Sequence, residues 1–122
     1  MPEPSGALVF YSALKKEHLK KTFSNHYQFV SNEFGSLFVS ISDDGDGRAP
    51  KGEVTLIASI FTRTKDWIDL DKQIYLKKKK DFMKQISYEL ENQFDIDPKN
   101  WLHRELATPL GFEKSFKKKT TL

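Results

Sequence analysis

The sequence contains no cysteine among its 122 residues. Disulfide bonds, thiolate nucleophiles, cysteine-ligated zinc and iron–sulfur clusters are therefore excluded. Long apolar runs are also missing: the longest cover residues 7–11 and 54–61, whereas a helix needs roughly 20 apolar residues to cross a bilayer. Residues 1–20 do not follow the order of a secretory signal peptide, because their apolar stretch precedes the lysines. We expect a protein that is not secreted and is either cytoplasmic or peripheral to an internal membrane.

Arginine is scarce, since only Arg48, Arg63 and Arg104 stand among the 20 basic residues. The lysines are clustered, notably at residues 77–80 and 117–119, and the net charge is +3. Proteins that read nucleic-acid bases favour the forked guanidinium of arginine, so we expect no nucleic-acid partner. The lysines at 77–80 are most simply a solvated helix face whose side-chain stems cover apolar neighbours. Their contact with anionic lipid is the alternative, which limits any membrane association to a peripheral one.

The composition is that of a globular domain, with 38% hydrophobic and 30% charged residues. A chain of this length holds one hydrophobic core, so residues 1–122 are assigned to a single domain. Alternating patterns and β-branched or aromatic residues predict four strands, at residues 7–14, 27–31, 37–42 and 53–62. The last strand alternates most strongly, with one face formed by Val54, Leu56, Ala58 and Ile60 and the other by Thr55, Ile57, Ser59 and Phe61.

The hydrophobic period changes after residue 70. Apolar residues then recur every three to four positions, which predicts an amphipathic helix over residues 71–94. Pro98 is expected to stop this helix. Its apolar stripe is Tyr75, Phe82, Ile86 and Leu90, widened by Leu76 and Met83. Residues 101–107 predict a fifth strand, and Thr108 followed by proline predicts a short helix over 110–116 before a frayed tail. The fold class is therefore α+β, a mainly antiparallel sheet of about five strands covered by one long amphipathic helix.

Residues with metal-binding or catalytic chemistry do not form a recognisable motif. Asp43, Asp44 and Asp46 are close in sequence, but their spacing is not that of an EF-hand loop. Residues 43–52 instead predict a metal-free turn between two antiparallel strands. No serine lies in a nucleophile-elbow motif, and the histidines lack the spacing of a helical zinc site: His18, His26 and His103. We therefore nominate no catalytic residue and no metal ligand.

Four segments, taken in order, are similar to parts of one enzyme family. They read Ser-Gly-Ala-Leu-Val-Phe-Tyr at 5–11, Ser-Leu-Phe-Val-Ser-Ile-Ser-Asp at 36–43, Gly-Asp-Gly-Arg-Ala-Pro-Lys-Gly at 45–52, and His-Arg-Glu-Leu-Ala-Thr-Pro at 103–109 followed by Phe112-Glu113. Together they resemble the carotenoid desaturase and carotene isomerase branch of the phytoene-desaturase-like FAD-dependent oxidoreductases, in its cyanobacterial-type members. Gly-Asp-Gly-Arg-Ala-Pro between two strands is the most specific element, and Glu-x-Ala-Thr-Pro is the second.

The resemblance covers residues 5–113, whereas residues 114–122 diverge from the family pattern. It implies the substrate-side domain of such a flavoprotein, a mixed sheet with covering helices. The family binds FAD through a G-x-G-x-x-G unit and a C-terminal Gly-Asp segment, and the six glycines of this chain form neither. The resemblance therefore implies a fragment or truncated domain of a carotene desaturase or cis-trans isomerase that binds no FAD and is inactive by itself.

The implied role is to contribute the apolar side of a polyene-binding site, where a carotenoid or another long apolar ligand is expected. The residues assigned to substrate lining are Phe10, Tyr11, Ile57 and Phe61. Some members of the set of five that these residues form with Trp67 are expected to make up an exposed apolar patch, and a homodimer is expected to form through it. The alternative is a stand-alone α+β binding or interaction module without catalytic activity.

Overall fold

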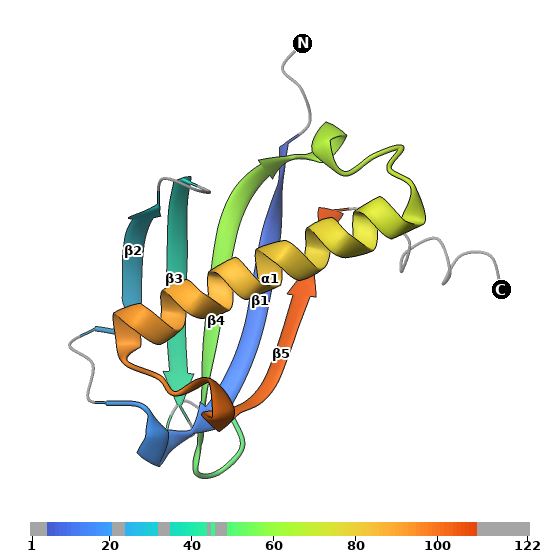
Figure 1. Cartoon of the computed structure of the whole chain (residues 1–122). Coiled ribbons are helices and arrows are strands. Elements are labelled where there is room, and N and C mark those ends of the chain that lie inside the picture. Colours follow the sequence, from blue (N-terminus) through green and yellow to red (C-terminus); the bar gives the residue numbers. More distant parts are fainter. Residues whose placement is uncertain (1–4, 21–23, 32–34, 44, 46–48, 110–122) are drawn as a thin grey trace, which may run out of the picture.

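The computed structural model describes residues 5–20, 24–31, 35–43, 45 and 49–109. They form a five-stranded antiparallel sheet and one long helix, which confirms the α+β class. The main elements are β1 (Ser5–Lys15), β2 (His26–Ser31), β3 (Gly35–Asp43), β4 (Glu53–Arg63), α1 (Lys72–Phe94) and β5 (Trp101–Ala107) (Figure 1). Single 3-10 turns lie at Lys16–His18, Thr64–Asp66 and Pro98–Asn100. The helix predicted at 110–116 and the tail after it lie outside the described residues.

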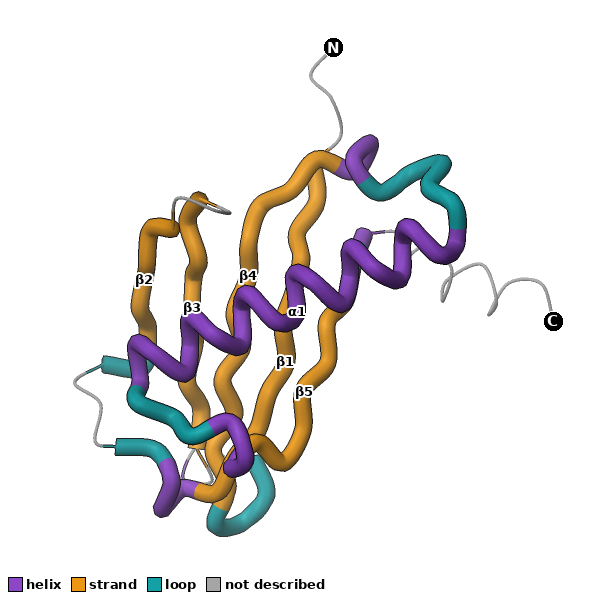
Figure 2. The backbone as a smooth tube through the Cα atoms, viewed as in Figure 1, coloured by secondary structure: helices purple, strands orange, loops and turns teal. Residues whose placement is uncertain are grey.

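The strands lie in the order β2-β3-β4-β1-β5, and each neighbouring pair is antiparallel (Figure 2). β1 therefore lies between β4 and β5, although it is the first strand in the sequence. Its pairing with β5 shifts register between Ala13 and Leu14, where β5 carries one extra residue. Residues 43–52 join β3 to β4, which pair with each other, so the prediction that this segment connects two antiparallel strands is confirmed.

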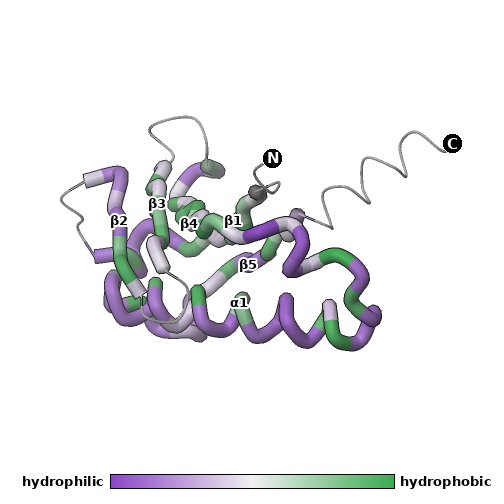
Figure 3. Tube along the Cα trace, turned by 90° about the horizontal axis from the view of Figure 1, so that it is seen from above, coloured by the Kyte–Doolittle hydropathy of each residue, from purple (hydrophilic) through white to green (hydrophobic). Residues whose placement is uncertain are grey.

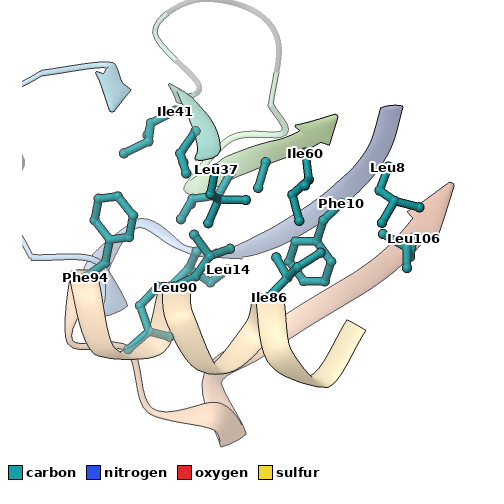
Figure 4. Close-up of a cluster of buried hydrophobic side chains, with 14 of the residues drawn as sticks. Leu8, Phe10, Leu14, Leu37, Ile41, Ile60, Ile86, Leu90, Phe94 and Leu106 are labelled. Carbon is teal, nitrogen blue, oxygen red and sulfur yellow. The ribbon is translucent and has the colours of Figure 1, made fainter. Parts of the chain in front are cut away.

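One face of the sheet is apolar and buried. In β4, the four residues at positions 54, 56, 58 and 60 are at most 2% exposed, which confirms the predicted alternation. The other strands add residues to the same core, most of them labelled in Figure 4: Leu8, Phe10, Leu14, Leu37, Val39, Ile41 and Leu106. Among the described residues, these side chains form one core with those of the helix.

α1 crosses the buried face of the sheet diagonally (Figures 1 and 3). It begins after Asp71, whose carboxylate accepts the backbone N–H of Gln73 at 3.1 Å, and it ends at Asp95, where φ is 55°. The residues that it buries are Tyr75, Ile86, Ser87, Leu90 and Phe94. Leu76 does not widen the stripe as predicted, since it is 50% exposed. Successive helix residues are about 100° apart, so Leu76 turns away where Tyr75 faces the sheet.

Trp67, one of the five candidates for an exposed patch, is fully buried and does not belong to such a patch. It follows β4, and its indole N–H donates to Thr62 Oγ1 at 3.2 Å. Its ring packs against Tyr75 and Phe82, at centroid distances of 5.9 and 5.7 Å. The N-terminal half of α1 thus supplies the partners that cover this ring, a contact that local sequence patterns do not reveal.

Lys78 shows that the lysines at 77–80 are not one uniformly solvated face. Its ammonium lies 4.6 Å from the centroid of the Trp67 ring and donates to the backbone carbonyl of Asp66 at 2.7 Å. A lysine that covers an aromatic ring and holds a backbone carbonyl anchors the start of the helix to the turn before it.

Candidate functional site

The face of the sheet opposite α1 is the candidate site. Figure 3 shows the helix on one side of the sheet. Successive residues of a strand point to opposite faces of the sheet. The residues that alternate with the buried ones along each strand therefore form rows on the other face. Two such rows cross the three central strands, and their residues are Ser40–Ile57–Tyr11 and Phe38–Ser59–Val9. We call the surface formed by these rows, together with Phe61, the open face.

Three aromatic side chains of the open face are exposed. Tyr11 is 42%, Phe38 38% and Phe61 75% exposed. Phe38 and Phe61 meet edge to face, with their ring centroids 6.1 Å apart. Large apolar side chains that stay in water do not gain the free energy of burial. A group of exposed aromatic side chains is therefore typical of a surface that binds an apolar partner or ligand.

Two hollows lie along the open face. One of about 310 Å³ is lined by Tyr11, Ala13, Thr55 and His103 among others. The other, of about 200 Å³, lies toward β2 and is lined by His26 and Phe38 among others. Ser40 and Ile57 line both hollows. The two hollows therefore adjoin and follow the sheet from β2 to β5, which suits an elongated ligand.

Two of the polar side chains around these hollows have identified partners. Thr55 Oγ1 donates to the backbone carbonyl of Ser42 at 3.2 Å. His103 Nε2 lies 3.4 Å from Glu105 Oε2 at the β5 edge, and both side chains are exposed. Small side chains such as Ala13 and Ser40 leave space at the centre of the face, while the His103–Glu105 contact lies at its rim. The chemistry that this arrangement favours is apolar contact rather than proton transfer.

The structure separates the four residues assigned to substrate lining. Tyr11, Ile57 and Phe61 share the open face, but Phe10 is fully buried on the opposite face beneath α1. Phe10 packs edge to face against Trp101, with a centroid distance of 6.3 Å. Its assignment to the lining therefore needs correction. Adjacent strand positions alternate between faces, so Phe10 and Tyr11 were never able to line one surface.

Sequence reasoning missed other residues that form the open face or line its hollows. Phe38 was detectable, because the alternation that buries Leu37 and Val39 turns Phe38 the other way. Ser40 was detectable in the same way, because it alternates with the buried Val39 and Ile41. His103 had no such signal, since its place beside Ala13 depends on the pairing of β5 with β1.

The described residues do not fit the FAD site of the family that the sequence resembles. Such a site places a glycine-rich turn and free helix amides against the pyrophosphate. Here α1 starts after Asp69, Leu70 and Asp71, and the Asp71 carboxylate already accepts the amide of Gln73. A negative charge at that position repels a phosphate group. No step of flavin chemistry is therefore assigned to this chain.

Comparison with known proteins leaves the chain without an assigned family. No protein-family model, curated protein sequence or solved structure matches it. Across the described residues, no helix is both long and apolar enough to span a membrane. The same part of the chain holds no group of three or more histidine, aspartate or glutamate residues placed to bind a metal ion.

Proposed function

We propose that this chain provides the apolar, substrate-facing surface of an FAD-dependent carotenoid oxidoreductase, as a domain of a larger flavoprotein. The observation that carries the proposal is the open face, with exposed Tyr11, Phe38 and Phe61 beside two adjoining hollows. The resemblance of residues 5–113 to carotene desaturases and isomerases supplies the class of ligand, a long polyene.

A polyene is recognised by shape and apolar contact, because it has no group that hydrogen-bonds. Each 100 Å² of apolar surface that it covers contributes about 2.5 kcal/mol. The open face offers such surface over the three central strands, and the contact between His103 and Glu105 lies at its rim. The redox or isomerisation chemistry is assigned to a flavin held elsewhere in the parent protein. Both desaturase and isomerase activities are compatible with this surface.

A stand-alone interaction module is the second candidate, and the same exposed aromatics favour it. Phe61 is 75% exposed near the end of β4, and Val30 on edge strand β2 is 78% exposed. A second copy of the chain, or an apolar protein surface, would cover these side chains in the way that interfaces bury aromatic anchors. This candidate requires binding without any polyene.

The test is a titration of the purified chain with detergent-dispersed carotene, followed by quenching of tryptophan fluorescence. Ile57→Lys places a charge between the two hollows and is expected to weaken carotene binding at least about tenfold, since an unpaired charge resists an apolar contact. Leu76→Lys is the matched control, because Leu76 is 50% exposed on α1, away from the open face. It is expected to bind carotene as the unmodified chain does. Equal loss in both variants, or no saturable binding by the unmodified chain, would contradict the proposal.

Sedimentation equilibrium of the same proteins without carotene separates the two candidates. A dimer that Ile57→Lys dissociates, in a chain that binds no carotene, would establish the interaction module. The DNA on either side of the coding segment gives an independent check. An adjoining G-x-G-x-x-G unit in the same reading frame is expected for a flavoprotein domain.

A further inference from the structure

A separate hollow of about 440 Å³ lies between α1 and the edge strand β5. From the helix it is lined by Lys80, Met83, Lys84 and Ser87, which are spaced i, i+3, i+4 and i+7 and so form one stripe. From β5 it is lined by Trp101, Leu102, His103 and Arg104. We call this hollow the α1–β5 groove.

Arg104 is directed to the groove by the pairing of β5 with β1. It pairs with Ser12, whose side chain is buried on the helix side of the sheet, so Arg104 also points to that side. His103, which also lines the groove, pairs with Ala13, and its Nε2 lies 3.4 Å from Glu105 Oε2 on the side of the open face. The cationic groups directed to the groove are therefore two lysines and one arginine.

These three cations have no carboxylate partner among the described residues. Lys80, Lys84 and Arg104 form no ion pair there, whereas other basic side chains, such as Arg63, do. The acidic group on the same helix stripe is Glu91, four positions after Ser87, and its carboxylate accepts the Trp101 indole N–H at 2.8 Å. Positive charge consequently exceeds negative charge along the groove.

Ser87 provides a second, independent observation. The residue is only 3% exposed, and its Oγ is buried without a hydrogen-bond partner in the described part of the chain. A buried hydroxyl without a partner costs free energy, so its presence needs a reason. An oxyanion in the groove would accept the hydrogen of this hydroxyl and leave it satisfied.

We propose that the α1–β5 groove binds a phosphate-bearing anion, held by Lys80, Lys84 and Arg104 and by the Ser87 hydroxyl. The guanidinium fork and two ammonium groups match the several oxygens of a phosphate. Leu102, which is 51% exposed beside the groove, offers apolar contact to the remainder of the ligand. This site lies across the sheet from the open face and does not depend on the function proposed for it.

The experiment measures binding of two probes to the complete chain. Inorganic pyrophosphate is titrated by calorimetry, and vesicles of phosphatidylcholine with or without phosphatidic acid are tested by co-sedimentation. Lys84→Gln and Arg104→Gln each remove one charge from the groove. Lys77→Gln removes the same charge from another face of α1, where Lys77 lines a hollow with Ile74 and Asp81. Circular dichroism and the thermal midpoint establish that each variant is folded.

We expect Lys84→Gln and Arg104→Gln to weaken binding about tenfold or more, as loss of a charge-assisted hydrogen bond does. Lys77→Gln is expected to change it less than about twofold. Such a pattern with pyrophosphate identifies a soluble phosphate ligand, and the same pattern only with phosphatidic acid vesicles identifies a lipid headgroup. Equal weakening by all three variants would overturn the site in favour of diffuse charge attraction. Absence of binding to both probes would overturn it as well.

The Ser87→Ala variant tests the contribution of the hydroxyl. If Ser87 donates to the anion, binding weakens several-fold while the thermal midpoint without ligand stays the same or rises, because an unsatisfied buried group has been removed. Unchanged affinity in this variant would overturn the role of Ser87 and leave a site formed by the three cations alone.

Discussion

The hydroxyl groups of Tyr75 and Thr108 lie 2.7 Å apart in a buried hydrogen bond. Tyr75 is in the first turn of α1, and Thr108 directly follows β5. The bond therefore ties the beginning of the helix to the end of the last strand, 33 positions later in the chain. Thr108 is also the threonine of the Glu-x-Ala-Thr-Pro segment, which gives that segment a structural role at the helix.

Loss of this bond should destabilise the fold measurably. Thr108→Val removes the hydroxyl and keeps the side-chain shape, so the free energy of unfolding is expected to fall by about 1–3 kcal/mol. Urea unfolding of Thr108→Val, Tyr75→Phe and the double variant measures the coupling between the two hydroxyls, which is expected to be about 0.5–3 kcal/mol. Strictly additive effects would show that the bond contributes nothing to stability.

The two faces of the sheet should respond differently to loss of a phenylalanine. Phe10→Ala leaves a cavity in the core and is expected to cost about 3–5 kcal/mol of unfolding free energy. Phe61→Ala removes a ring that is 75% exposed and touches Phe38, so the expected cost is below about 1 kcal/mol. Chemical denaturation of both variants makes the comparison. Similar costs would contradict the placement of Phe61 on a solvent-exposed face.

The purified chain is expected to be colourless and to bind no FAD. The amide of Gln73 at the start of α1 is occupied by the Asp71 carboxylate, whose charge opposes a pyrophosphate. A fluorescence-quenching titration with FAD should therefore show no saturation, and the chain alone should turn over no carotene. Stoichiometric binding at micromolar FAD would reveal a nucleotide site and would reject the view that the flavin is held elsewhere.

Millimolar calcium is expected to leave the thermal midpoint unchanged. Residues 43–52 connect β3 to β4, and turn-forming residues account for their composition. A cation that binds only the folded state raises the midpoint by mass action. A rise with calcium but not with an equal ionic strength of sodium would mean that the aspartates of this segment bind the ion.

Local sequence patterns determined the secondary structure of the described chain. The period of two in residues 53–62 and the period of three to four in residues 71–94 reappear as β4 and α1, with ends close to those predicted. Pro98 lies four residues beyond the helix, and Asp71 caps its start. Such signals are readable because backbone geometry sets side-chain direction within a single element.

Which face of β1 is covered by α1 was decided only by the tertiary structure. In β1 both alternating sets are largely apolar, so the sequence of that strand does not tell Phe10 from Tyr11; the register with β4 places Phe10 under α1 and Tyr11 on the open face. The burial of Trp67 also depends on tertiary contacts, because Tyr75 and Phe82 of the helix pack against its ring.

The two candidate surfaces depend on strand pairing in the same way. Pairing of β5 with β1 directs Arg104 toward α1 and His103 toward the open face. Composition and periodicity determined that this chain forms a sheet and a helix with one buried side. Contacts between residues distant in sequence decided which side chains remained exposed, because burial is a property of what packs against a residue and not of the residue itself.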